Sequence, residues 1–132
     1  MLERIEWEGK LIAMIVRGNP TPAKTVFVTT PESEMQVGVV VFPAGGSVAP
    51  HRHPPKTRSI TTTCEMVFVR KGRCELDFYS DDRRLVATRE LGKDDLALML
   101  GCGHGFRMLD DTVLLEVKQG PYGGAGEKEL LT

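Results

Sequence analysis

Short apolar segments alternate with turn residues along most of the chain. The segments are rich in Val, Ile, Phe and Thr, and Gly, Pro, Asp and Ser separate them at intervals typical of a β-sandwich or β-barrel. No long window combines helical periodicity with capping residues, so we expect little helix. The pattern predicts an all-β fold with strands at 11–16, 25–30, 35–42, 65–70, 73–79, 84–90, 96–100, 104–109 and 112–118.

The clearest predicted hairpin covers residues 74–90. Cys74, Leu76 and Phe78 alternate with more polar residues, which predicts one packed face and one solvated face. The sequence "SDDR" then supplies a turn before the next strand. Two further tight turns are predicted, at Gly72 and Gly92.

The length favours a single domain over residues 1–132. A chain of 132 residues can bury roughly two thirds of the surface that it exposes when unfolded. No repeat or low-complexity linker divides it, and the glycine-rich end at 120–132 predicts a flexible or partner-dependent tail. An all-β chain must also protect its strand edges, which closing or sandwiching the sheets achieves.

Charge and composition exclude two classes of partner. The chain has 17 Lys and Arg against 18 Asp and Glu, and these charges are scattered, so we expect neither nucleic acid nor a membrane as a partner. The start "MLERIEWEGK" lacks a signal-peptide core, and the apolar runs are too short to cross a bilayer. The 3 cysteines form no C-x-x-C pair, which argues against a disulfide framework. We therefore expect a cytoplasmic protein with buried thiols.

The candidate chemistry is a metal site built from the three histidines and one glutamate. His51 and His53 are two residues apart, so on an extended chain they project to the same side. Glu65 opens an apolar strand, where a carboxylate is costly to bury unless it is paired or bound to a metal. His104 also stands at the start of a strand. Three imidazoles and a carboxylate suit one divalent transition metal ion, namely Zn, Fe, Ni, Mn, Co or Cu.

These residues resemble the first motif of the cupin superfamily, G-x5-H-x-H-x3,4-E-x6-G. Gly45, His51, His53, Glu65 and Gly72 occupy its fixed positions. A second cupin motif, in which a glycine, a Pro-x-Gly and a histidine follow, is similar to residues 92–104. The chain also resembles small bacterial cupins of the sugar-phosphate isomerase-like group. The resemblance implies a single-domain cupin-type jelly-roll β-barrel, with a metal ion bound by His51, His53, Glu65 and His104.

The sequence departs from the cupin pattern in two places. Eleven residues separate His53 from Glu65 instead of three or four, which predicts an added loop. Met99 stands where the second motif has proline, and one extra residue precedes His104. If the loop keeps Glu65 away from the ion, three histidines form the ligand set, open to water or substrate.

A substrate site is expected beside the metal. Arg58 and Lys56, in the added loop, could hold an anionic group, although such cations are often merely solvated. Phe106 and Met108 are predicted to point inward, which indicates a small substrate with one chelating polar end. Cys102 could bring a thiol near the ion, or be a buried residue. Candidate proton-transfer groups, for which structural packing is the alternative, are Gln36, Tyr79, Lys118 and Tyr122.

Three functions remain open at this point. The first is an isomerase or epimerase that uses the metal as a Lewis acid on a small oxygenated metabolite such as a sugar or an anion. The second is an Fe(II)-dependent dioxygenase with the same ligands. The third is a non-catalytic module that binds or senses a small molecule. An apolar sheet face and the segment around Trp7 also predict a homodimer, although Trp7 could simply anchor the core.

Overall fold

The computed structural model describes residues 1–131 and divides them into two compact units. The first unit contains Met1–Pro20 and the chain from Thr62 onward, and the second contains Thr21–Thr61. All strand pairs are antiparallel, and the described residues form a single helical element, a 3-10 helix at Gly124–Glu127. The all-β expectation is therefore confirmed. No sheet closes into a barrel within residues 1–131.

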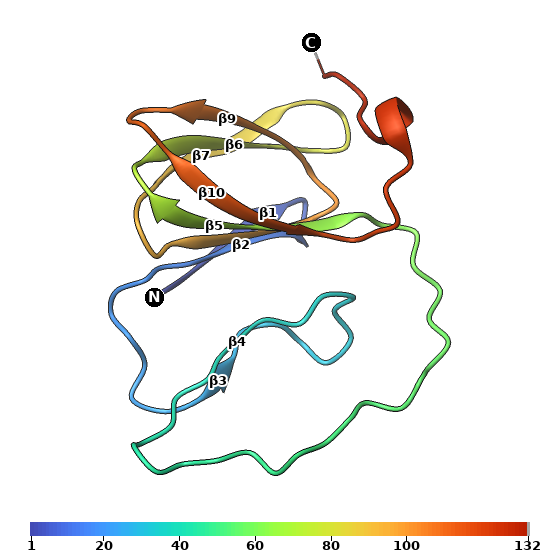
Figure 1. Cartoon of the computed structure of the whole chain (residues 1–132). Coiled ribbons are helices and arrows are strands. Elements are labelled where there is room, and N and C mark those ends of the chain that lie inside the picture. Colours follow the sequence, from blue (N-terminus) through green and yellow to red (C-terminus); the bar gives the residue numbers. More distant parts are fainter. Residues whose placement is uncertain (132) are drawn as a thin grey trace. The chain divides into compact units, whose positions relative to one another are not determined.

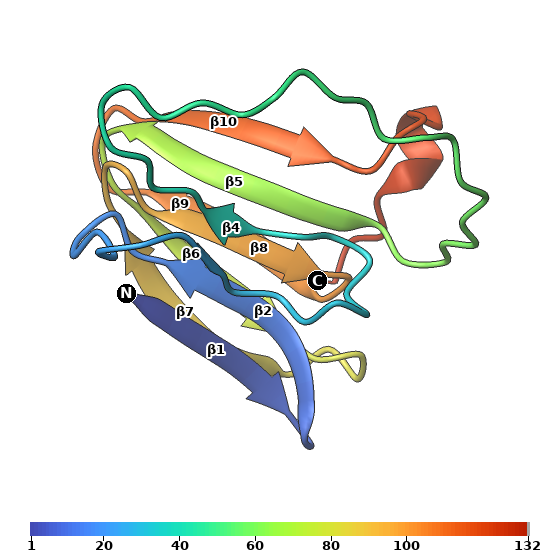
Figure 2. The ribbon, with the colours of Figure 1, turned by 90° about the horizontal axis from the view of Figure 1, so that it is seen from below.

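The larger sheet of the first unit has five strands. In spatial order they are β1 (Leu2–Trp7), β2 (Lys10–Val16), β8 (Leu96–Leu100), β5 (Cys64–Lys71) and β10 (Val113–Lys118). Figure 2 shows this order across the sheet. Strands β1 and β10 are the two edges.

The smaller sheet of the first unit has three strands, in the order β7 (Leu85–Leu91), β6 (Cys74–Tyr79) and β9 (Gly103–Met108). Figure 1 shows the two sheets of this unit as separate layers. Their facing sides share one apolar core, because alternate residues on each strand point to the same side. The core residues include Ala13, Ile15, Val67, Val69, Leu76, Phe78, Ala97 and Met99. Each fully buried Val, Leu, Ile, Phe or Met side chain among them stabilises the fold by about 1.5–3 kcal/mol.

The predicted hairpin and its face are confirmed. Strands β6 and β7 pair antiparallel, and Cys74, Leu76 and Phe78 are fully buried. The turn between them is closed by the Ser80 amide, which donates to the Arg84 carbonyl at 2.9 Å. Gly72 has a φ of 80°, a conformation that glycine adopts without strain, in the turn between β5 and β6.

Strand β1 was not predicted from the sequence. Its inward positions are held by Glu3, Ile5 and Trp7, of which Ile5 is buried and Trp7 packs on the core. The Glu3 carboxylate accepts hydrogen bonds from Arg17 at 2.6 Å and from Arg89 at 2.9 Å. These two cations allow a charged residue to occupy an inward position of the strand.

The second unit contains one short strand pair. β3 (Val26–Phe27) pairs with β4 (Gly38–Val39), so the strands expected at 25–30 and 35–42 shrink to two residues each. Beside them the Val37 amide donates to the Thr29 hydroxyl at 3.0 Å, and the Val41 amide donates to the Thr25 hydroxyl at 2.9 Å. Residues 42–61 of this unit are exposed and form no strand.

No helix in residues 1–131 is long and apolar enough to span a membrane. The three cysteines, Cys64, Cys74 and Cys102, are all buried, as expected.

Candidate metal site

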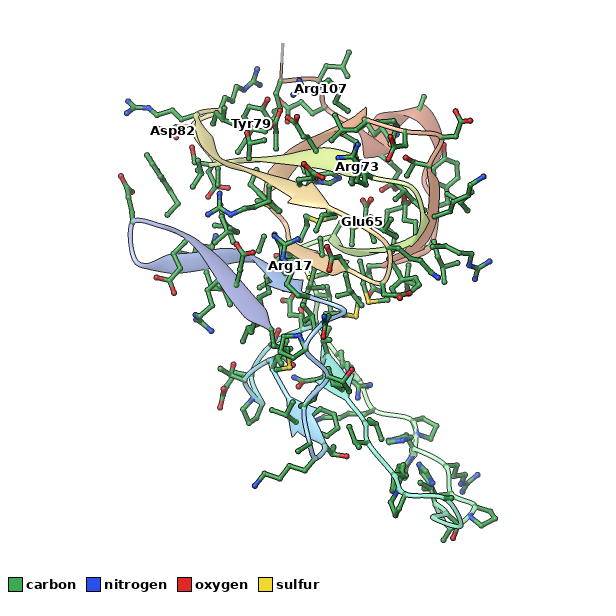
Figure 3. The ribbon with its side chains drawn as sticks, turned by 90° about the vertical axis from the view of Figure 1, so that its left-hand side faces the viewer. Arg17, Glu65, Arg73, Tyr79, Asp82 and Arg107 are labelled. Carbon is green, nitrogen blue, oxygen red and sulfur yellow. The ribbon has the colours of Figure 1, made fainter. Side chains whose placement is uncertain are left out.

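Glu65 and His104 meet between the two sheets of the first unit. Glu65 lies on β5 and His104 on β9, and the Glu65 Oε2 atom is 3.5 Å from the His104 Nε2 atom. The exposed fraction of the side chain is 13% for Glu65 and 25% for His104. Figure 3 shows Glu65 on the side of its strand that faces the smaller sheet. A carboxylate and an imidazole from distant parts of the chain thus share one shielded location.

The strand registers explain this meeting. Glu65 continues the inward row of Val67 and Val69, and its register partner on β8 is the buried Met99. His104 lies opposite the buried Phe78 on β6, so it occupies an inward position of the smaller sheet. Cross-strand partners share a face, which places both polar side chains in the layer that elsewhere forms the core.

The other ring nitrogen of His104 forms a hydrogen bond with the backbone. Nδ1 lies 3.2 Å from the carbonyl oxygen of Cys102. Since a carbonyl only accepts hydrogen bonds, Nδ1 carries the proton, and in the neutral ring Nε2 has an unshared electron pair. That pair faces a Glu65 oxygen, which is also an electron-pair donor. A proton or a metal ion is needed between them for this contact to be favourable.

The distance between these two atoms fits ligands of one ion. Ligands about 2.0–2.2 Å from a metal, at angles of 90° to 109°, are about 2.8–3.6 Å from each other. The 3.5 Å between Glu65 Oε2 and His104 Nε2 falls in this range. A backbone carbonyl that holds Nδ1–H is also the usual second partner of a metal-binding histidine.

In the absence of metal, a proton takes this position. The hydrogen bond with Glu65 raises the pKa of His104, although burial opposes the shift. The same hydrogen bond from His104 lowers the pKa of Glu65, again against the effect of burial. The pair therefore favours an imidazolium beside a carboxylate.

His51 and His53 form a second imidazole pair, within the second unit. Their ring centroids are 5.2 Å apart in an edge-to-face arrangement, so the two rings lie on the same side of the extended chain, as predicted. The Nδ1 atom of His51 lies 2.9 Å from the carbonyl oxygen of Ala49. Nε2 of His51 is thus available to accept a metal, as in His104. Both rings are exposed.

The four predicted ligands therefore occur as two pairs, one in each unit. Within residues 1–131, no group of three or more His, Cys, Asp or Glu side chains is arranged to hold a metal ion. Each pair by itself supplies two donor atoms.

The predicted substrate-binding residues differ in their environments. Phe106 is half-buried, packs on the core and lies edge-on to the His104 ring at 5.9 Å between centroids. Met108 shares that face, because its register partner is the buried Cys74, but 48% of it is exposed at the end of β9. Arg58, in the second unit, is exposed, and Nη1 donates to the Lys56 carbonyl at 3.5 Å.

Cys102 is buried, with 8% of its surface exposed. Burial raises the pKa of its thiol to about 11. A thiol that stays protonated at neutral pH is a poor metal ligand, so in this state the contribution of Cys102 to the site is its carbonyl oxygen.

Two charged residues near the pair were not selected from the sequence as part of the metal site. On β10, Lys118 is the register partner of Glu65, and Glu116 is the partner of Val67. Both therefore face the smaller sheet, and both influence the pKa of Glu65. Leu114 is half-buried and lies on the same face of β10 as these two residues. Recognising Leu114 as an inward residue would have identified both of them.

Comparison with protein-family models, with curated proteins and with solved structures found no match to this chain.

Proposed function

We propose that this protein is a small metal-binding cupin in which His51, His53, Glu65 and His104 bind one divalent transition metal ion. The observation that carries the proposal is the approach of Glu65 Oε2 to His104 Nε2, at a distance suited to two ligands of one ion. The backbone contacts of His51 and His104 at Nδ1 add support, since both leave Nε2 available. The donor set of three imidazoles and a carboxylate suits Zn, Fe, Ni, Mn, Co or Cu.

The strand order of the first unit supports a jelly-roll fold for this cupin. A jelly roll has eight strands in two packed sheets. Besides β1, the first unit supplies four strands to the larger sheet and three to the smaller one. One strand is then required next to an edge of the smaller sheet, and β9 with His104 is such an edge.

The proposed activity is the conversion of a small oxygenated metabolite, in the manner of an isomerase or epimerase. A bound ion would polarise a carbonyl or hydroxyl of the substrate as a Lewis acid. The residues of the chain would hold that ion through four ligands, and the Phe106 ring would exclude water from one side of His104. The non-catalytic alternative, a metal-dependent binding module, uses the same residues.

Metal analysis of designed variants tests the proposal. Protein purified without added metal is stripped and titrated with zinc by calorimetry. We expect one ion per chain in the wild type, and an affinity loss of at least about tenfold in His51→Ala and in His104→Ala. Arg52→Ala is the matched control, because Arg52 is exposed between the two histidines and should leave zinc binding unchanged. Equal zinc affinity in the wild type and in His104→Ala would refute the site.

An Fe(II)-dependent dioxygenase is the second candidate, favoured by the apolar ring of Phe106 against His104. Elemental analysis together with an oxygen electrode separates it from the first. Bound iron and oxygen uptake during turnover would support the dioxygenase. Zinc, nickel or manganese with turnover but no oxygen uptake would support the isomerase or epimerase.

The expected homodimer is also a proposal, and the edge strand β10 supports it. Val113, Leu115 and Val117 form an outward row on this strand, each with 45–46% of its surface exposed. An exposed apolar edge strand is a ready site for pairing with another chain. Light scattering at micromolar concentration should give twice the mass of 14.6 kDa, and a monomer would refute the dimer.

A further inference from the structure

Lys118 lies at the charged end of an inward row on β10. The row on β10 consists of Leu114, Glu116 and Lys118, which lie opposite Val69, Val67 and Glu65 on β5. Leu114 packs on the core, so the row changes from apolar to charged toward the end of the strand that carries Glu65. The exposed fraction of the Lys118 side chain is 30%.

The contacts of Lys118 leave its ammonium group with unused donors. Its Nζ atom lies 3.4 Å from Oε1 of Glu116 and 5.9 Å from the centroid of the Tyr122 ring. Charge-assisted hydrogen bonds to carboxylates are usually about 2.7–2.9 Å, so the contact with Glu116 is loose. An ammonium has three N–H donors, and a single loose ion pair uses at most one of them.

The ion pair with Glu116 does not by itself account for a lysine at this position, which also lies opposite the Glu65 carboxylate. The Glu116 side chain is 48% exposed, and exposed ion pairs contribute about 0–1 kcal/mol. Partial burial of an ammonium without firm partners is costly, and an apolar residue would extend the packing of Leu114 at no such cost. Lys118 is a partly shielded cation with spare hydrogen-bond donors, and it lies directly opposite Glu65 on the neighbouring strand. Such a group is suited to bind an anion.

We propose that Lys118 binds the carboxylate or phosphate end of a small ligand whose other end reaches the Glu65–His104 site. This inference rests on the proposed function, which it deepens by naming the class of substrate: a small hydroxy or oxo compound that carries one oxyanion. The ring of Tyr122, itself 76% exposed, lies beside the ammonium and would cover one side of the bound anion.

Glu116 acts as the competitor of the ligand. Its carboxylate pairs with the Lys118 ammonium when no anion is bound, and its negative charge repels an incoming anion. Binding therefore requires Lys118 to exchange Glu116 for the ligand. Removal of this charge in Glu116→Gln should strengthen anion binding, whereas removal of the cation in Lys118→Met should weaken it.

Calorimetric titration with inorganic phosphate and, separately, with acetate tests the subsite. Metal-free and zinc-loaded samples are used for the wild type, Lys118→Met, Glu116→Gln and the control Lys71→Met. Lys71 is exposed at the far end of β5, opposite Val113, so its substitution removes the same charge outside the site. We expect at least one of the two anions to bind the wild type with a Kd of about 10 mM or tighter. Lys118→Met should weaken that binding roughly tenfold or more, and Lys71→Met should not change it.

Equal anion affinity in Lys118→Met and the wild type would overturn the inference, as would the absence of binding of both anions to the wild type. Whether phosphate or acetate binds more tightly identifies the oxyanion. A readout without any variant comes from amide NMR signals of the wild type, where the anion should shift Lys118 and Tyr122 at lower concentrations than Lys71. The zinc titration reports separately on the proposed function. Lys118-dependent anion binding without zinc binding would refute the metal site alone, and zinc binding without Lys118-dependent anion binding would refute the subsite alone.

Discussion

Glu65 Oε2 and His104 Nε2 lie 3.5 Å apart, although the two residues are 39 positions apart along the chain and belong to different sheets. Since the Cys102 carbonyl holds Nδ1–H of His104, two electron-pair donors face each other unless a cation lies between them. The same geometry therefore accepts either a proton or a metal ion. Metal-free protein and metal-loaded protein should differ in how their stability depends on pH.

The first prediction concerns this pH dependence in metal-free protein. The pKa of His104 is raised, so its contribution is complete below its unfolded value of about 6.5 and is lost as pH rises through the folded value. The pKa of Glu65 is lowered, so its contribution is present above about 4.3 and is lost as pH falls through the folded value. The pair should thus stabilise most between about pH 4.3 and 6.5.

Urea unfolding with a chelator present measures this effect. The wild type should be more stable than His104→Gln. The difference between their free energies of unfolding should be about 1 kcal/mol larger at pH 5.5 than at pH 8.5. Glu116 and Lys118 from β10 also face the pair, so Glu116→Gln and Lys118→Met are measured alongside to separate their contributions. A difference between wild type and His104→Gln that stays constant over this range would contradict the pairing.

Strand phase explains how much of the site could be predicted. Glu65 and His104 each begin an apolar strand, so their inward orientation follows from the alternation of Val67, Val69 and Phe106. The sequence offered Lys118 only as a candidate proton-transfer group of ambiguous orientation and did not single out Glu116, because Val113, Leu115 and Val117 make the opposite face of β10 look equally apolar. Which face of such a strand is buried depends on its partners, and these are set by tertiary structure.

Local patterns predicted the β6–β7 hairpin and the glycine turns, because both depend on residues close in sequence. Strand β1 was not predicted, because its formation depends on residues that are distant in sequence. Glu3 occupies an inward position there only because Arg17 and Arg89, 14 and 86 residues away, neutralise it. Pairing between distant residues leaves no periodic signal in a single sequence.

The second prediction concerns Cys102. Burial raises the pKa of its thiol to about 11, so at pH 8 about one molecule in a thousand carries the reactive thiolate. We expect iodoacetamide to label Cys102 very slowly in native protein and rapidly in urea, as followed by mass spectrometry of peptides. Rapid labelling of Cys102 under native conditions would show that the thiol is accessible and activated.

The third prediction concerns the turn between β5 and β6. Gly72 has a φ of 80°, and a Cβ atom there would collide with the Asp111 carbonyl and approach the Thr112 hydroxyl to 2.7 Å. Gly72→Ala should therefore lower the free energy of unfolding by about 1–3 kcal/mol. Gly92→Ala is the control, because its φ is not positive and no atom lies within 4 Å of the added methyl group. A stability loss in Gly92→Ala equal to that in Gly72→Ala would argue against strain at the turn.

The fourth prediction concerns Asp95, which precedes β8 and ties three segments of the first unit together. Its Oδ2 atom accepts from Arg17 Nη1 at 2.9 Å and from the Gly92 amide at 2.9 Å, and its Oδ1 atom accepts from the Gly18 amide at 3.0 Å. The exposed fraction of its side chain is 14%, so water replaces these partners poorly.

In Asp95→Asn, one of the two oxygens becomes an NH2 group that only donates. This NH2 group then faces either the Gly18 amide or the Arg17 and Gly92 donors. At least one hydrogen bond is lost, and two hydrogen-bond donors point at each other. We expect the free energy of unfolding to fall by about 1–3 kcal/mol, measured in urea at pH 7. Asp94→Asn makes the same chemical change one residue earlier, at an exposed position with a φ of 72° that asparagine adopts well, and should change stability by less than about 0.5 kcal/mol. If the two variants lose the same stability, the loss comes from the change in net charge and not from the three contacts of Asp95.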